Sequence, residues 1–260
     1  MARDGTAEGS KPNLNHSCPY PALHSLLFRS FAMPLSRRRF LATSLGLAVA
    51  GPAAAQSYGQ FFKVENDEGR PVANMRLPGE ITGQIQELRG VTYLGPREAE
   101  VTLYEFFDYN CPWCRKAAAD LTALSGSDAA LRIGLVHNPI LSPMSAQAAK
   151  VSLAVQRKLG SAAAFAFYGQ LLATRGQIDG LKALETAAKT GVPRAELEQI
   201  ADSEEVRQAL RAHMNVAANL GLTATPSYVL GNTGVLGHPG VKSLARMIAA
   251  VRRCDQIACG

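Results

Sequence analysis

Short apolar runs along the chain predict strands at five places, in two groups that lie far apart in sequence. The first group covers residues 91–94, 101–107 and 131–136. The second covers residues 227–230 and, more weakly, 234–236. Runs of this length, rich in β-branched and aromatic side chains and bounded by Gly, Pro or Asn, are typical of buried strands. We therefore expect one sheet that both groups complete.

Apolar residues at helical spacing dominate the chain between these groups. Ser142 is suited to cap a helix and Pro143 to its first position. Helical spacing then continues over residues 162–172, 181–189, 193–200 and 202–220. An α/β domain with a helical insertion is the simplest architecture for this order. We expect residues 92–141 and 221–260 to form the two parts of the sheet domain, and residues 142–220 to form the helical insertion.

The N-terminal segment has the features of an export signal. Residues 37–39 are all arginine, residues 41–50 form a short apolar run, and the alanines at 53–55 suit cleavage before Gln56. Residues 36–41 also resemble the twin-arginine export motif. An ordinary secretory signal with an arginine-rich start is the alternative interpretation.

The position of this signal sets the expected boundaries. A signal works poorly behind a long upstream segment, so we expect the protein to start at Met33 and to be cleaved near Ala55 and Gln56. We expect the mature protein in the periplasm. Residues 1–32 are then upstream sequence, and residues 33–55 are the signal peptide. Residues 56–91 are polar and irregular in pattern, so we expect them to form an N-terminal extension.

The charge distribution argues against a nucleic-acid partner. The formal net charge is +6, but residues 1–55 hold six Lys/Arg against two Asp/Glu, which leaves 21 against 19 in residues 56–260. Nucleic-acid binding needs a basic surface, and most of the basic excess lies in the expected signal. The chain also has no Gly-rich phosphate loop and no serine-nucleophile motif, and we expect no cofactor.

The chemistry of the chain concentrates at Cys111-Pro112-Trp113-Cys114, which follows a strand and opens a helix. The N-terminus of a helix stabilises a thiolate, so Cys111 is the expected nucleophile. Cys114, one turn further, is the expected resolving thiol, which attacks a mixed disulfide and releases the partner. Pro112 fits the first turn, where a missing N–H costs little. The other interpretations are a permanent disulfide or half of a zinc site.

Two segments resemble a known family. Residues 105–115 read EFFDYNCPWCR and residues 221–229 read GLTATPSYV. The first is similar to the active-site segment, and the second to the cis-proline loop, of the DsbA-like thiol:disulfide oxidoreductases. This resemblance, over about residues 94–253, implies a thioredoxin-like mixed sheet with an inserted helical subdomain.

The resemblance also implies roles for single residues. Pro226 would be cis, and Thr225 would offer its backbone N–H and C=O to an extended substrate segment. Glu105 matches a buried acid that helps to move the proton of the resolving cysteine. The Pro112-Trp113 dipeptide departs from the Pro-His of the best-known oxidases in this family, so the thiolate loses an imidazole that could stabilise it.

Cys254 and Cys259 form a second pair near the end of the chain. On a continuous helix, side chains five residues apart lie on different faces, so a disulfide requires the helix to end between them. A structural disulfide is the expected arrangement, ahead of a second redox centre. A four-cysteine zinc site with Cys111 and Cys114 is the rival interpretation, although export to an oxidising compartment argues for no metal.

The sequence therefore predicts an exported thiol:disulfide oxidoreductase that donates disulfides through Cys111 and Cys114. Its expected partners are unfolded or partly folded cysteine-containing exported proteins and a membrane redox partner that resets the site. The alternative is an isomerase or reductase of the same fold. Such a protein usually needs an oligomerisation element, which only residues 56–91 could supply.

Overall fold

The computed structural model describes residues 60–260. The predicted start at Met33, the upstream residues 1–32, the signal over 33–55 and the cleavage after Ala55 lie outside the described residues.

A six-stranded mixed sheet forms the centre of the fold, in the order β1-β6-β5-β3-β4-β2. The neighbouring strands β3 and β4 are parallel, and every other neighbouring pair is antiparallel. The strands are β1 (Asn74–Arg76), β2 (Thr92–Leu94), β3 (Val101–Phe107), β4 (Leu131–His137), β5 (Ser227–Leu230) and β6 (Thr233–Leu236). The two groups of strands that the sequence predicts thus complete one sheet.

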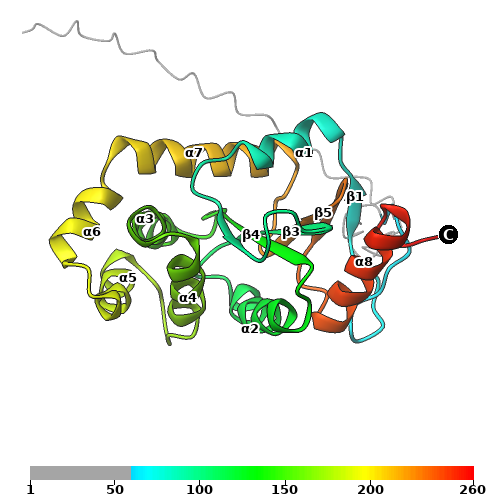
Figure 1. Cartoon of the computed structure of the whole chain (residues 1–260), viewed down its shortest axis with the longest axis horizontal. Helices are drawn as coiled ribbons and strands as arrows, with labels where there is room; N and C mark the ends of the chain where they lie inside the picture. The colour runs from blue at the N-terminus through cyan, green and yellow to red at the C-terminus, as the bar shows by residue number, and fades with distance from the viewer. Residues whose placement is uncertain (1–59) are drawn as a thin grey trace, which may run out of the picture. The chain divides into compact units, whose positions relative to one another are not determined.

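Helices cover both faces of this sheet. Odd-numbered residues of β3, such as Leu103 and Phe107, pack against α2 (Pro112–Ser127) and α8 (Val241–Cys254). Even-numbered residues, such as Phe106, face α1 (Gly79–Gln86) and the end of α7 (Glu204–Asn219), as Figure 1 shows. Alternation along a strand therefore assigns Glu105 to the face that α2 covers.

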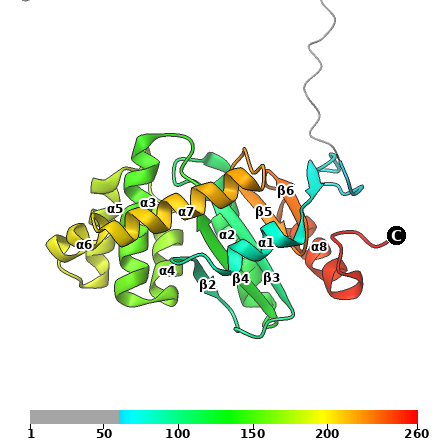
Figure 2. The same cartoon turned by 90° about the horizontal axis from the view of Figure 1, so that it is seen from above.

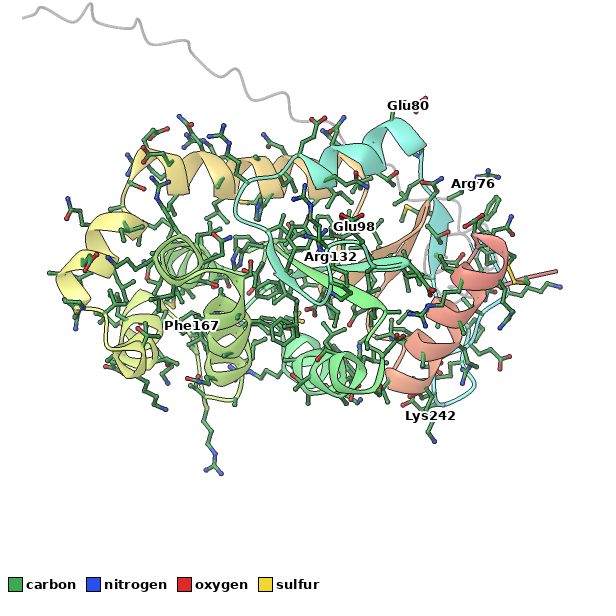
Figure 3. All side chains as sticks on the ribbon, in the orientation of Figure 1. Arg76, Glu80, Glu98, Arg132, Phe167 and Lys242 are labelled. Carbon is green, nitrogen blue, oxygen red and sulfur yellow. A yellow bond between two sulfur atoms is a disulfide. The ribbon has the colours of Figure 1, made fainter. Side chains whose placement is uncertain are left out.

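The helical insertion joins β4 to β5. Its central helix α3 packs against α4, α5, α6 and α7. Phe167 of α4 is buried inside it, whereas the side chains of Glu80 and Lys242 extend outward from α1 and α8 (Figure 3). The elements are α3 (Pro143–Leu159), α4 (Ser161–Leu172), α5 (Gly180–Ala187), the short 3-10 helix Ala188–Thr190, α6 (Arg194–Ala201) and α7.

Helix α7 belongs to the insertion at one end and to the sheet at the other (Figure 2). Near its start, Val206 and Leu210 pack with Leu153 of α3. Near its end, Val216 and Leu220 pack on the sheet. The helix that was predicted to close the insertion therefore also forms part of the core of the sheet domain.

The expectation that residues 56–91 are irregular is wrong for two stretches. Residues 74–76 pair with β6 as β1, at the edge of the sheet. Residues 79–86 form α1, which packs on α7. The strand is only three residues long and the helix contains Gly79 and Gly83, so neither carries a clear apolar period. Their structure comes from the contacts they make, not from local preference.

Candidate active site

The loop between β3 and α2 is held in place by side chains that the sequence places around the two cysteines. The Asp108 carboxylate accepts hydrogen bonds from the backbone N–H groups of Asn110 (2.7 Å) and Leu141 (2.9 Å). The Asn110 amide donates to the Ile178 carbonyl and accepts from the Ile178 N–H, both at 2.8 Å. These bonds tie the loop to the helical insertion at two points. Asp108 and Asn110 therefore position the cysteine that follows.

Cys111 caps α2, and Pro112 occupies the first helical position. The Cys111 Sγ lies 3.0 Å from the carbonyl oxygen of Thr225, and the Thr225–Pro226 peptide is cis. Hydrogen bonding from the Cys114 thiol, helped by the backbone N–H groups at the helix start, lowers the pKa of Cys111 to about 6. Most Cys111 is thus a thiolate at neutral pH.

Cys114 has the opposite environment. It is fully buried one turn inside α2, and both cysteines are free thiols. Burial raises the pKa of Cys114, and so do its hydrogen bond to Cys111 and the nearby Glu105. The two sulfurs therefore ionise very differently, with the negative charge kept on Cys111.

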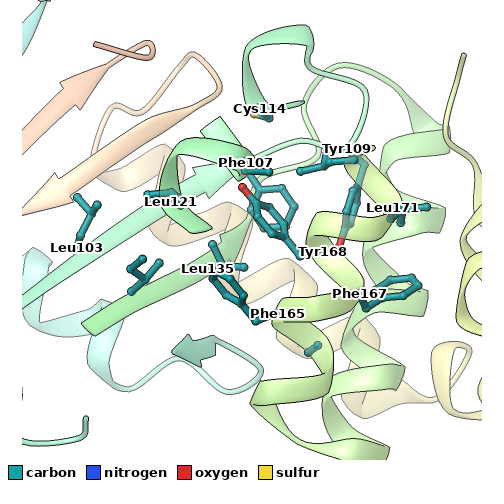
Figure 4. Close-up of a cluster of buried hydrophobic side chains, with 14 of the residues drawn as sticks. Leu103, Phe107, Tyr109, Cys114, Leu121, Leu135, Phe165, Phe167, Tyr168 and Leu171 are labelled. Atoms are coloured by element: carbon teal, nitrogen blue, oxygen red, sulfur yellow. The ribbon is translucent and has the colours of Figure 1, made fainter. Parts of the chain in front are cut away.

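Glu105 lies on β3, with no exposed surface. Its Oε2 accepts a 2.6 Å hydrogen bond from the hydroxyl of Tyr168, and its Oε1 has no partner among the described residues. Burial raises the pKa of Glu105 to about 8, against the effect of the Tyr168 hydrogen bond. Figure 4 shows Tyr168 of α4 beside Phe107, in the same cluster as Cys114.

The family model of the DSBA-like thioredoxin domain matches residues 102–249 of this chain, a range that includes every residue of this site. The chain belongs to this family. As a DSBA-like protein it is a thiol:disulfide oxidoreductase, with the α/β fold and mixed sheet that the resemblance implied. A search of curated proteins finds no match for it.

Solved structures share the fold of this DSBA-like chain. A thioredoxin-like oxidoreductase from Silicibacter pomeroyi DSS-3 is 29% identical, with a TM-score of 0.61 over 66% of this chain and 97% of that one. The thiol-disulfide exchange protein alpha-DsbA2 from Wolbachia pipientis is 21% identical, with a TM-score of 0.61 over 66% and 92%. A periplasmic thioredoxin-like protein from Salmonella enterica serovar Typhimurium is 18% identical, with a TM-score of 0.61 over 69% and 99%.

Two apolar side chains are exposed at or next to the active-site loop. Trp113, between the two cysteines, is 58% exposed. Leu141 is 53% exposed, and its N–H is bonded to Asp108 in the active-site loop. An exposed aromatic and an exposed aliphatic side chain near the site offer contact surface to an apolar peptide.

The second cysteine pair is joined and lies apart from this chemistry. Helix α8 ends at Cys254, and a disulfide links Cys254 to Cys259 with a Cα–Cα distance of 6.0 Å. Ile257, inside the loop that this disulfide closes, is buried in the main core. Within residues 60–260, no group of three or more His, Cys, Asp or Glu side chains is placed to hold a metal ion. Among the same residues, no helix is long and apolar enough to cross a membrane.

Tyr168 is the site residue that sequence reasoning missed. It lies in a helix whose other residues at this spacing, Ala164, Phe165 and Leu171, are buried and apolar, so its pattern suggests packing alone. A tyrosine on an apolar helix face is the one available signal, because a buried hydroxyl needs a hydrogen-bond partner.

Proposed function

We propose that this oxidoreductase works in the periplasm, where it donates disulfides to unfolded or partly folded proteins through Cys111 and Cys114. The observation that carries the proposal is the unequal placement of the two thiols. Cys111 lies at the N-terminus of α2, whereas Cys114 is fully buried one turn inside it. A protein that keeps Cys111 as a stable thiolate favours its own reduced form, and such a protein is a strong disulfide donor. The similar protein from Salmonella enterica is periplasmic, which supports this compartment.

Donation begins with the Cys111–Cys114 disulfide. A substrate thiolate attacks Cys111 Sγ, and the bond to Cys114 breaks, so that Cys114 leaves with the electron pair. A second substrate thiolate then attacks the substrate sulfur of the mixed disulfide, and Cys111 leaves as a thiolate. The substrate loses two electrons and gains a disulfide, and the protein gains both electrons. The low pKa of Cys111 makes it the better leaving group in the last step.

Glu105 supplies the proton that this exchange needs. The departing Cys114 sulfur is buried, and burial favours its neutral form. Glu105 is protonated over most of the neutral range because burial holds its pKa at about 8. It gives its proton to Cys114 during donation. When a membrane redox partner restores the disulfide, Glu105 takes a proton from Cys114, whose thiolate then attacks Cys111 Sγ and expels the partner's sulfur.

The substrate segment lies against the loop that carries Thr225 and Pro226. This loop meets Cys111 directly, because the Thr225 carbonyl contacts the reactive sulfur. An extended peptide would pair with the Thr225 backbone as an added strand, with its cysteine beside Cys111. Trp113 and Leu141 would contact apolar side chains on either side of that cysteine. Such contacts suit unfolded chains, which expose apolar residues.

The reduction potential of the Cys111–Cys114 pair tests this proposal. Trp113 is the single tryptophan, so its emission in a glutathione titration reports the redox state of the site. We expect a potential nearer to the value of about −120 mV known for DsbA itself than to about −270 mV for thioredoxin. The Cys254→Ser, Cys259→Ser variant is the control and should give the same titration. A thioredoxin-like potential would contradict the oxidase and favour a reductase.

A further inference from the structure

A second set of buried polar side chains lies beneath α2, on the face of the sheet that carries Glu105. The Tyr228 hydroxyl lies 2.8 Å from His238 Nδ1, and His238 Nε2 lies 2.7 Å from Asp120 Oδ2. A carboxylate only accepts hydrogen bonds, so Nε2 carries the proton and donates to Asp120. Nδ1 then accepts from the Tyr228 hydroxyl. The three side chains form a line of hydrogen bonds that all point from Tyr228 toward Asp120.

This line begins next to Glu105. In the ladder between β3 and β5, Tyr228 lies directly opposite Glu105, so both side chains project from the same face. Neither residue has exposed surface. The Glu105 Oε1 has no hydrogen-bond partner among the described residues, and the Tyr228 hydroxyl bonds to His238, so these two groups are not hydrogen-bonded to each other in this conformation. Burial raises the pKa of Tyr228, and the neighbouring Glu105 and Cys114 raise it further, which agrees with this placement.

The line ends at the surface. The Asp120 side chain is 17% exposed, and its Oδ2 also accepts a 2.7 Å hydrogen bond from Lys116, which is 51% exposed. The His238 side chain itself is 1% exposed. The charged groups around His238 are Asp120 and Lys116 on α2 and Asp67 in the loop before β1. Burial lowers the pKa of His238, and the carboxylates of Asp120 and Asp67 oppose that effect.

Glu105 and Cys114 need such a connection with solvent. After donation Glu105 is left as a carboxylate, and its pKa of about 8 favours uptake of a new proton from solvent at neutral pH. That proton must leave before Glu105 can accept the one on Cys114. Both groups are fully buried, so bulk water does not reach them in this conformation. A proton crosses a buried region through side chains that accept one proton and donate another.

We propose that Tyr228, His238 and Asp120 conduct protons between Glu105 and solvent, an inference that rests on the function proposed above. In the outward direction, the protonated Glu105 carboxyl turns toward Tyr228 and gives its proton to the Tyr228 oxygen, while the Tyr228 hydroxyl proton passes to His238 Nδ1. The Nε2 proton moves to Asp120, which releases it to water. Tyr228, His238 and Asp120 each end with the number of protons they began with, although the His238 proton has moved from Nε2 to Nδ1. Only Glu105 loses a proton and becomes a carboxylate.

The rate at which the Cys111–Cys114 disulfide closes tests this proton route. Reduced protein is mixed with oxidised glutathione, and Trp113 emission is followed in time. Attack by Cys111 gives a phase whose rate depends on glutathione, and closure by Cys114 gives a phase whose rate does not. In Tyr228→Phe, the closure phase should slow by at least about tenfold. Attack by Cys111 and the reduction potential should stay unchanged, because a proton route changes a rate and not an equilibrium.

Two further variants separate proton conduction from structural support. In His238→Gln, the amide can donate to Asp120 and accept from Tyr228, but it cannot pass a proton from one side to the other. This variant should close as slowly as Tyr228→Phe, with a larger solvent deuterium isotope effect than the wild type. Tyr104→Phe removes a hydroxyl from a buried tyrosine next to Glu105 on the opposite face of the sheet, and it should close at the wild-type rate.

The possible outcomes distinguish a failure of the proton route from a failure of the proposed function on which it rests. Closure at the wild-type rate in both Tyr228→Phe and His238→Gln overturns the proton route alone. A changed reduction potential with unchanged closure also overturns it, since the residues would then act only through their charge. If the wild-type protein showed no exchange that depends on Cys111, the proposed function and the route would both be wrong.

Discussion

The Tyr168 hydroxyl, on helix α4 of the insertion, donates a 2.6 Å hydrogen bond to the Glu105 carboxylate on strand β3 of the sheet. The two residues are 63 positions apart in sequence. The insertion therefore does more than cover one end of the fold, because one of its side chains adjusts the acidity of the group beside Cys114. In the proposed mechanism, the ease of proton transfer to and from Cys114 therefore depends on the packing of α4 against the sheet.

Replacing Tyr168 by Phe should raise the pKa of Glu105 further. The hydrogen bond stabilises the ionised carboxylate, so its loss adds to the effect of burial, which already holds the pKa at about 8. The pH at which closure by Cys114 reaches half its maximal rate should increase accordingly. Tyr109→Phe is the matched control, because that buried hydroxyl bonds to Ser152. Equal shifts in both variants would contradict a specific role for Tyr168.

Glu105 should make the reduced protein less stable as pH rises. Its folded pKa of about 8 lies above the ordinary glutamate value of 4.5, which applies to the unfolded chain. Its contribution is therefore complete below about pH 4.5 and is lost as pH rises through 8. Glu105→Gln should remove this part of the pH dependence, which amounts to roughly 1.4 kcal/mol per unit of pKa difference.

Urea unfolding at pH 5 and pH 8 measures this effect. Both proteins should carry Cys111→Ser, because the lowered pKa of Cys111 gives a dependence of opposite sign above pH 6. The same loss of stability between pH 5 and pH 8 with and without Glu105→Gln would show that another group is responsible.

Serine variants of the two active-site cysteines should differ in whether they retain substrates as mixed disulfides. Cys114→Ser should retain substrates as mixed disulfides on Cys111, and these should dissolve in reductant. Cys111→Ser should retain none, because the remaining Cys114 is buried and its pKa is raised. Non-reducing gels of proteins captured from an oxidising extract provide the measurement. If Cys111→Ser formed the stable adducts instead, the roles of the two residues would be reversed.

Removing the C-terminal disulfide should reduce stability without affecting exchange. The Cys254→Ser, Cys259→Ser variant frees the loop that holds Ile257 in the core. The chain-entropy model gives a loss of about 2 kcal/mol for a loop this short. Thermal unfolding under oxidising conditions should show the loss, and it should disappear in reductant, where the wild-type disulfide is also open. A change in the rate of exchange would show that this pair takes part in the chemistry.

Local sequence determined the elements and the reactive pair of this protein. A strand, a turn with Cys111-Pro112-Trp113-Cys114 and a helix follow from residues next to one another, since apolar spacing and the helix start act over a few positions. The two distant groups of strands also indicated one sheet with a helical insertion. The short strand β1 and helix α1 escaped prediction because their stability comes from β6 and α7.

Tertiary structure alone decided which distant side chains meet around that pair. The Thr225 carbonyl reaches Cys111 from 114 positions away, and His238 reaches Asp120 from 118 positions away. Tyr228 and Glu105 face each other only because of the register between β3 and β5. No local pattern encodes such register or the docking of an insertion, because both result from the packing of whole elements. The acidity of the site, and the proton transfer that we propose for it, depend on these contacts, so they are properties of the folded chain.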